Sequence, residues 1–232
     1  MDPLAGSSWS EPGTVAGFVR AFPNEVLMRF AARVRSHPGT GRALDIGCGA
    51  ARNAVPLAGL GWDVVGTDLS WPMLTAAAER ARAEHVSDRV HLILAPMDRI
   101  PFANQTFDLV VAHGIWNLAR SGSEFRRAVR EAARVARPGA ALFVFTFSRH
   151  TFPGDAEPVA GESFVFTQFS GRPQCFLTEA QLLAELGAAG FVADPDLPMT
   201  EYNRRLPGSV PGSAPAIFEC AFRRTAPPGE TA

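Results

Sequence analysis

The pattern of apolar and polar residues alternates between two kinds of segment along most of the chain. Short apolar runs, typical of buried strands, are separated by longer stretches whose apolar residues recur at helical spacing. Strands joined through helices form parallel sheets, because parallel neighbours need crossover connections. The pattern therefore predicts an α/β fold with helices on both faces of a mostly parallel sheet. Strands are expected at 43–47, 63–68, 90–96, 107–113, 140–147, from 191 onward and at 216–224.

Helices are expected between these strands, and two of them carry clear start signals. Asn24 and Thr178 each precede an amphipathic stretch, and both residue types cap helix N-termini through their side chains. The tripeptide RPG at 137–139 is expected to form a turn before the fifth strand. The predicted helices cover 25–34, 54–61, 72–85, 123–136 and 179–190.

Two irregular segments flank the alternating core. Residues 1–23 are rich in Gly, Pro and Ser but carry apolar anchors such as Trp9 and Phe18, which predicts a cap that docks on other residues. The alternation stops after Phe147. Residues 148–177 hold several aromatic side chains and are a candidate lid, with one extra strand expected at 164–169.

Composition narrows the class of protein. The chain has 232 residues and a net charge of −1, which fits one globular domain and argues against a protein that coats nucleic acid or anionic lipid. All its basic side chains are arginine, so a Schiff-base lysine and a P-loop lysine are excluded. We expect no leader peptide and no membrane span.

The three cysteines, Cys48, Cys175 and Cys220, are widely spaced and form no C-x-x-C pair. Neither a metal site nor a disulfide framework is therefore predicted, and a reducing, cytoplasmic setting is expected. Cys48 stands between two glycines with no obvious base nearby. We interpret it as a small buried filler without a nucleophilic role.

The stretch 43–53, ALDIGCGAARN, contains the chemistry around which the chain is organised. It combines a strand with a glycine-rich turn and a helix start, which is how open α/β sheets build a nucleotide pocket. A nicotinamide fingerprint needs a small residue where Arg52 stands, and Asp45 would repel a pyrophosphate but attract a cationic group. Asp68 ends the second strand, where a carboxylate accepts hydrogen bonds from ribose hydroxyls. The ligand is predicted to be an adenosine with a positive, non-phosphate attachment.

These motifs resemble the class I S-adenosylmethionine-dependent methyltransferases of the small-molecule type. The resemblance covers about residues 41–147, and the residue pair at 52–53 is similar to the tellurite-resistance and thiopurine-like branch, although that branch usually has glycine where Ala51 stands. The resemblance implies a Rossmann-like, seven-stranded sheet and S-adenosylmethionine as cofactor. The motifs that carry it are LDIGCGAARN, VVGTDLS, APMDRIPF, FDLVVAHG and RPGAALFVF.

The resemblance also implies which residues hold the cofactor. For Asp45 and Asp68 the alternative is an ordinary strand-end carboxylate that accepts backbone amides, and for Asp98 it is an ion pair with Arg99 or a loop cap. The implied contacts are Asp45, Gly47 and Gly49 around the methionine portion, Asp68 on the ribose, Leu69 on the adenine, Asp98 beside Met97 on the adenine amino group, and His113 near the ammonium end.

Methyl transfer from a sulfonium is an in-line displacement, so a general base is needed only when the acceptor must first lose a proton. His113 and His150 follow the fourth and fifth strands and are the candidate bases. The alternative for His113 is that its carbonyl touches the cofactor while its ring packs. Glu201 and Tyr202, before the final strand, could also face a substrate.

Aromatic and arginine side chains in the irregular segments are candidates for acceptor binding. The aromatic residues could form an apolar pocket under a moving lid, although the core is the better interpretation for each except Trp9. The arginines could clamp an acidic substrate, although solvated arginines are commoner, and the basic stretch 126–137 is interpreted as a solvated helix face. The candidates are Trp9, Trp116, Phe164, Phe166, Phe169, Arg172, Arg204 and Arg205.

We expect one domain that transfers a methyl group to a small-molecule acceptor, as a monomer or homodimer, without binding nucleic acid or membrane. Two alternatives stay open at this point. One is a cofactor-binding regulatory or assembly module without methyl transfer, and the other is an enzyme that methylates protein or RNA. The expected parts are a cap segment and helix at 1–36, a cofactor-binding core at 37–147, a lid at 148–177, and a C-terminal helix with strands at 178–232.

Overall fold

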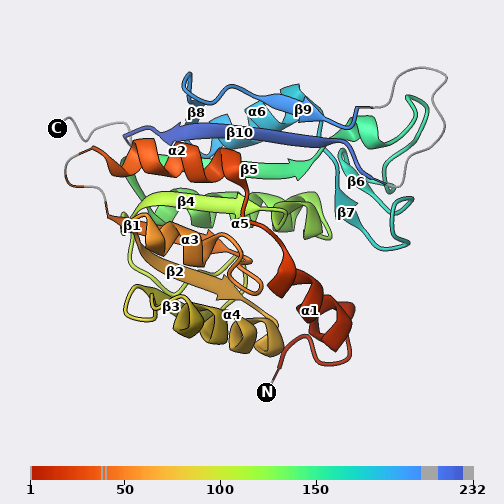
Figure 1. The fold of residues 1–232 in the computed structure, drawn as a ribbon. Coiled ribbons are helices and arrows are strands. Elements are labelled where there is room, and N and C mark those ends of the chain that lie inside the picture. Colours follow the sequence, from red (N-terminus) through yellow and green to blue (C-terminus); the bar gives the residue numbers. More distant parts are fainter. Residues whose placement is uncertain (1, 38, 40, 205–213, 227–232) are drawn as a thin grey trace.

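A twisted sheet forms the centre of the computed structural model, which describes residues 2–226 except 38, 40 and 205–213 (Figure 1). Its strand order is β3-β2-β1-β4-β5-β10-β8, and β9 pairs with the first three residues of β10. The first five strands are parallel, and β10 runs antiparallel to its neighbours. The strands are β1 (Arg42–Ile46), β2 (Asp63–Asp68), β3 (Val90–Leu94), β4 (Phe107–His113), β5 (Ala136–Phe147), β8 (Phe191–Ala193), β9 (Thr200–Tyr202) and β10 (Ile217–Arg224).

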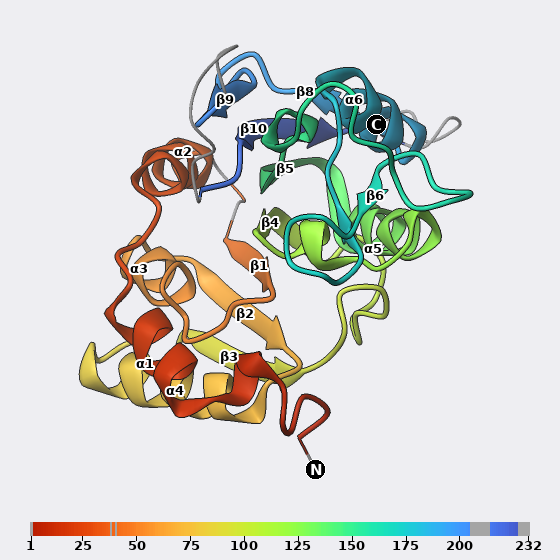
Figure 2. The same ribbon diagram turned by 90° about the vertical axis from the view of Figure 1, so that its right-hand side faces the viewer.

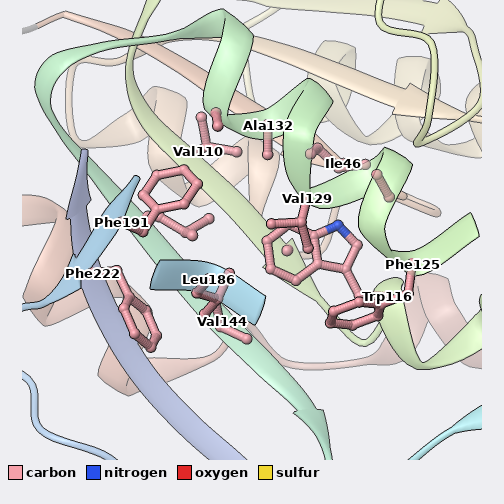
Figure 3. Packing of buried hydrophobic residues seen from close by; sticks show 14 of the residues in the cluster. Ile46, Val110, Trp116, Phe125, Val129, Ala132, Val144, Leu186, Phe191 and Phe222 are labelled. Carbon is pink, nitrogen blue, oxygen red and sulfur yellow. The ribbon is translucent and has the colours of Figure 1, made fainter. Parts of the chain in front are cut away.

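Helices cover both faces of the sheet, as predicted. One apolar cluster lies between the sheet and α2, α3 and α4, and a second lies between the opposite face and α5 and α6. Figure 3 shows the second cluster, which joins the sheet residues Val110 and Val144 to the α5 residues Val129 and Ala132. The helices are α1 (Pro12–Arg20), α2 (Glu25–Arg35), α3 (Ala54–Gly59), α4 (Trp71–Ala83), α5 (Gly122–Val135) and α6 (Glu179–Ala188).

The predicted helix starts are confirmed by their hydrogen bonds. The Asn24 side chain accepts from the Leu27 amide over 2.8 Å and caps α2. Thr178 caps α6 in a reciprocal arrangement in which Gln181 bonds back to the Thr178 amide. Both caps satisfy amide groups that have no partner inside the helix.

Four local predictions were wrong or incomplete. Residues 137–139 are not a separate turn, because β5 begins directly after α5 and its pairing with β4 shifts between Phe107 and Leu109. The cap segment contains the helix α1, and the connection before the last strand contains β9. The extra strand expected at 164–169 is only β6 (Val165–Phe166), paired with β7 (Gln174–Cys175).

The parallel strands all end at one edge of the sheet, which Figure 2 views from the front. On one side of this edge α1 packs beside α4, and on the other side lies the short β6–β7 hairpin. Ligands of open α/β sheets bind at the carboxyl ends of the strands. The fold therefore brings the glycine turn, the cap segment and the 148–177 segment around the same edge.

Candidate active site

The glycine turn after β1 depends on backbone conformations that favour glycine. Gly47 and Gly49 have φ of +68° and +52°, in the left-handed region where a side chain is strained. A Cβ on Gly47 would lie 2.6 Å from Cδ1 of Ile115, which follows β4. The turn is tied to β2 by the Cys48 amide, which donates to the Thr67 carbonyl over 2.9 Å. The turn at the carboxyl edge thus needs glycine both for its backbone conformation and for the close packing of Ile115.

Asp68 holds the glycine turn from the end of β2. Its Oδ2 accepts from the Gly49 amide over 2.9 Å, and its Oδ1 accepts from the Ser70 amide over 2.8 Å. Burial raises the pKa of this carboxyl, while the backbone hydrogen bonds oppose that rise. Asp68 therefore fixes the geometry of the turn and also presents a carboxylate at its rim.

Asp45 is a buried acid with an oxygen that lacks a partner. Only 2% of the residue is exposed, and among the described residues its Oδ2 has no hydrogen-bond donor. Burial raises its pKa to about 7, although the charge of Arg52 favours ionisation. A buried carboxylate oxygen without a donor is costly. The buried oxygen of Asp45 can therefore accept a hydrogen bond from a cationic or neutral donor group of a ligand.

His113 has both ring nitrogens next to donors. Arg52 donates from Nη2 to Nδ1 over 2.9 Å, and Nδ2 of Asn24 lies 3.3 Å from Nε2. The ring stacks on Phe145 with centroids 4.2 Å apart. Burial, reinforced by the Arg52 charge, lowers the pKa of His113 to about 3. The imidazole is therefore neutral at physiological pH, and its accepting nitrogen is occupied.

A buried acid on β10 continues this polar network. Glu219 is 3% exposed, and its Oε1 accepts from Nδ2 of Asn24 over 2.6 Å. Its Oε2 accepts from the hydroxyl of Tyr202 over 2.9 Å, and this contact is the main cause that raises the tyrosine pKa. The network connects the start of α2 to β4, β9 and β10.

A second polar cluster lies after β5. His150, in the 3₁₀ turn Arg149–Thr151, has its Nδ1 2.7 Å from Oε1 of Glu201 on β9. The same carboxylate oxygen accepts from the Ser148 hydroxyl. Arg204 is 3.6 Å from the other oxygen of Glu201. This brings together residues from two connections that sequence alone could not place relative to each other.

Aromatic side chains pack together between the end of β5 and the 148–177 segment. Phe176 is buried and contacts four rings, with centroid distances of 4.6 Å to Phe152, 5.1 Å to Phe147, 5.7 Å to Phe169 and 6.1 Å to Phe166. We call these five residues the aromatic cluster. Phe169 is 38% exposed at its outer side. The cluster gives this side of the carboxyl edge an apolar surface.

The N-terminal cap reaches the glycine turn. A ring atom of Phe18 lies 3.0 Å from where a Cβ on Gly49 would stand, and Trp9 packs edge-on against Phe18 at 6.0 Å. The Ser70 hydroxyl donates to the Trp9 carbonyl over 3.2 Å. The predicted docking of the cap thus involves Trp9, and its target is the start of α4 and the glycine turn.

Comparison with known proteins identifies the family. A model described as a methyltransferase domain matches residues 44–144. A ubiquinone biosynthesis O-methyltransferase of Azorhizobium caulinodans is 32% identical over 208 residues, which span 82% of this chain and 78% of that protein. The chain belongs to the class I S-adenosylmethionine-dependent methyltransferases. It transfers the methyl group of this cofactor to a small-molecule acceptor.

Further matches set the limits of this comparison. A demethylmenaquinone methyltransferase of Corynebacterium urealyticum is 33% identical to this chain over 144 residues, which span 61% of this chain and 57% of that protein. Two solved structures share the fold with a TM-score of 0.64, the [4+2]-cyclase SpnF and a Burkholderia thailandensis 1,6-didemethyltoxoflavin N1-methyltransferase. They are 22% and 20% identical and cover 90% and 88% of this chain, with 85% and 80% of theirs. One of them is a cyclase, so the fold alone does not decide the chemistry.

The methyltransferase brings most of the predicted cofactor residues to one edge. Asp45, Gly47, Gly49 and Asp68 converge at the turn, and Leu69 and Met97 are partly buried at the ends of neighbouring strands. Asp98 accepts from Nε of Arg127 over 3.0 Å, so its ion-pair partner is on α5 and not the adjacent Arg99 that sequence suggested.

Other candidates are divided between core and surface. Trp116, Phe164 and Phe166 are buried in the core, whereas Arg172 is exposed. Arg204 pairs with Glu201, and Arg205 lies outside the described residues. Cys48 is buried, and burial raises its thiol pKa.

Sequence reasoning missed the network through Arg52, Asn24 and Glu219. Glu219 had a signal, because it interrupts an otherwise apolar strand, IFECAF.

Within the described part of the chain, no helix has the length and apolar character needed to cross a membrane. Within the same residues, no group of three or more His, Cys, Asp or Glu side chains could hold a metal ion.

Proposed function

We propose that the methyltransferase methylates a hydroxylated aromatic ring at the carboxyl edge of its sheet. The aromatic cluster carries this proposal, because it stands at the end of β5, the strand that pairs with β4. Planar acceptors stack well on such side chains. The relatives are named for ubiquinone biosynthesis and for demethylmenaquinone, and reduced quinones are hydroxylated aromatic rings.

The residues of the glycine turn fit S-adenosylmethionine. When bound, this cofactor supplies a methyl group already activated on a positively charged sulfur. The unpartnered oxygen of Asp45 suits an ammonium group, and the left-handed backbone at Gly47 and Gly49 forms the turn beside it that is assigned to the methionine portion. Asp68 is assigned to the ribose hydroxyls. Together these residues would hold the cofactor at the carboxyl edge of the sheet, where the aromatic cluster also lies.

The remaining predicted contacts are assigned in the same way. Leu69 and Met97 would pack on the adenine, and Asp98 would accept from its amino group with the oxygen that Arg127 leaves free. His113 is assigned a positioning role, because as a neutral acceptor it holds the Arg52 guanidinium near Asp45. We do not assign His113 the role of general base.

The 148–177 segment is proposed to act as a lid that excludes water from the acceptor. Arg149 ties it down by donating to the carbonyls of Pro153 and Ala156 over 2.9 and 2.7 Å. Exclusion of water strengthens the electrostatic interactions in the site and prevents side reactions. Residues 1–36 cap the cofactor side, and 37–147 with 178–232 complete the single domain.

Two measurements test this proposal. Calorimetric titration with S-adenosylhomocysteine measures cofactor-site binding, and Asp68→Ala should abolish it. Asp63→Ala is the matched control, because Asp63 begins the same strand and pairs at the surface with Arg42 and His91. That variant should bind normally.

A panel of acceptors then defines the chemistry. Catechols, simple phenols and reduced naphthoquinones are incubated with deuteromethyl-labelled cofactor, beside arylamines, peptides and RNA, and products are found by mass. Label on the hydroxylated rings is expected. Label confined to peptide or RNA, or tight binding of the demethylated cofactor with no transfer to any acceptor, would reject the proposal.

A further inference from the structure

The His150 imidazole is held in one orientation by a carboxylate. Its Nδ1 lies 2.7 Å from Oε1 of Glu201, whose side chain is only 14% exposed. A carboxylate is an acceptor, so the proton of the neutral imidazole stays on Nδ1. The lone pair of His150 is then on Nε2. A fixed tautomer with an available lone pair is what a general base requires.

The backbone that carries His150 is anchored on both sides. The His150 amide donates to Oγ of Ser148 over 3.1 Å, and that hydroxyl donates in turn to Glu201. The Arg149 amide donates to the Leu177 carbonyl over 2.8 Å, and the Ala216 amide donates to Oγ1 of Thr151 over 3.0 Å. Because these bonds come from three other segments, the ring position is set by the fold and not by a free loop.

The second nitrogen of His150 is accessible. The side chain is 41% exposed, and no described residue makes a hydrogen bond to Nε2. His113 is the opposite case, because it is only partly exposed and Arg52 already donates to Nδ1. Of the two histidines that follow the strands at this edge, only His150 can take a proton from an acceptor.

Charged groups around His150 come from two elements. Glu201 on β9 faces Nδ1, and Arg204 faces the other carboxylate oxygen at 3.6 Å. Arg149, on the same turn as His150, directs its guanidinium to lid carbonyls and to the Phe166 ring, 5.0 Å from its centroid. Glu201 is thus the described charged group in direct contact with the imidazole.

We propose that His150 is the general base for an O–H acceptor and that Glu201 is its positioning residue. This inference rests on the proposed function, since it needs an acceptor with a hydroxyl group. Nε2 of His150 takes the hydroxyl proton, and the resulting imidazolium is balanced by Glu201. The acceptor oxygen bonds to the methyl carbon as the carbon–sulfur bond breaks and leaves its electron pair on sulfur. His150 then releases the proton to water through its exposed side.

The first test measures the tautomer without any reaction. Long-range proton–nitrogen NMR spectra of the ¹⁵N-histidine-labelled protein should show His150 with a protonated Nδ1 and a bare Nε2. Glu201→Leu should remove this preference while S-adenosylhomocysteine binding stays within about twofold of wild type. A wild-type His150 with its proton on Nε2 would overturn the proposal.

The second test measures methyl transfer to a phenolic acceptor. His150→Gln should lower kcat by about 10²- to 10³-fold, in the range that general bases contribute, with unchanged affinity for S-adenosylhomocysteine. Glu201→Gln should lower kcat less, by about tenfold, because Gln still accepts from Nδ1 but cannot balance the imidazolium. His91→Gln is the matched control, since His91 also pairs with a carboxylate, at 2.9 Å to Asp63, but on the outer strand β3.

Acceptor acidity separates a base from a structural residue. A nitrophenol ionises near neutral pH without help, so the loss caused by His150→Gln should shrink to a few-fold with this acceptor, and alkaline pH should rescue the variant on ordinary phenols. An equal loss for both acceptors, or no loss in kcat, would refute the role of His150. Wild-type transfer to phenols would leave the proposed function intact in either case, whereas its absence would reject the proposed function itself.

Discussion

Nδ2 of Asn24 donates a 2.6 Å hydrogen bond to Oε1 of Glu219, which joins two residues 195 positions apart in the sequence. The same asparagine caps α2 with its side-chain oxygen, and its amide donates to Oδ1 of Asn53 over 3.0 Å. Asn24 therefore fastens the N-terminal helix to the last strand and to the residue that precedes α3. This fastening lies directly beside the His113 ring.

Replacement of Asn24 by alanine should destabilise the protein more than loss of a cap alone. A missing cap costs about 0.5–2 kcal/mol, and a buried acid that loses its donor costs about 1–3 kcal/mol more. Chemical denaturation should show a combined loss of about 1.5–5 kcal/mol. Ser121→Ala is the control, because Ser121 caps α5 through the Glu124 amide without a buried acid attached. Equal losses in the two variants would contradict this account.

Cofactor affinity should fall as the pH drops below about 7. Asp45 has a pKa raised to about 7 by burial, so acid protonates it and removes the charge assigned to the cofactor ammonium. Each pH unit below 7 should weaken S-adenosylhomocysteine binding by up to about tenfold, measured by calorimetry from pH 7 to 5.5. Asp45→Asn should bind weakly at pH 7 and lack this slope.

The same acid makes an opposite contribution to the folding of the free protein. Its pKa in the folded state lies above the ordinary value of 3.8, so the folded state binds the proton more tightly than the unfolded chain does. The contribution of Asp45 to stability is therefore full below about pH 4 and is lost as the pH rises through 7. Urea titrations between pH 4 and 7 measure the free energy of unfolding of the wild type and of Asp45→Asn. If the two free energies change with pH in the same way, the predicted contribution of Asp45 is contradicted.

Gly47→Ala should damage both folding and cofactor binding. The left-handed backbone costs a side chain about 1–2 kcal/mol, and the new Cβ would lie 2.6 Å from Cδ1 of Ile115. Gly139 provides the control, because it has a φ of +79° but no atom within 4 Å of the added Cβ. Thermal unfolding should show a larger loss for Gly47→Ala, with S-adenosylhomocysteine affinity reduced only in that variant.

Two residues of the aromatic cluster should have different roles: Phe176 should stabilise the fold, and Phe169 should contact the acceptor. Phe176→Ala leaves a buried cavity and should cost about 3–5 kcal/mol. Phe169→Ala removes a ring that is 38% exposed and should raise the KM for the acceptor several-fold while cofactor affinity and unfolding change little. Val192→Ala, at an exposed position on β8, controls for loss of surface apolar area. An unchanged acceptor KM in Phe169→Ala would remove Phe169 from the acceptor site.

Much of the fold was readable from the sequence because its signals are local. Apolar runs and amphipathic stretches gave the alternation of strands and helices, and Asn24 and Thr178 marked helix starts. The short elements were not readable. β9 has three residues and the strand β6 only two, so their form depends on neighbouring strands and not on periodicity.

By itself, the sequence was enough to predict the cofactor and the strand ends that would bind it. Asp45, the glycines and Asp68 lie close together along the chain, and parallel strands necessarily end at one edge, so spacing alone brought them together. Only the tertiary structure shows how the surroundings of His113 and His150 differ. Both follow a strand at that edge, but Arg52 and burial make one a neutral acceptor, while Glu201, 51 residues away, orients the other. The hydrogen-bond partners of each histidine depend on long-range packing, which the residue types alone do not specify.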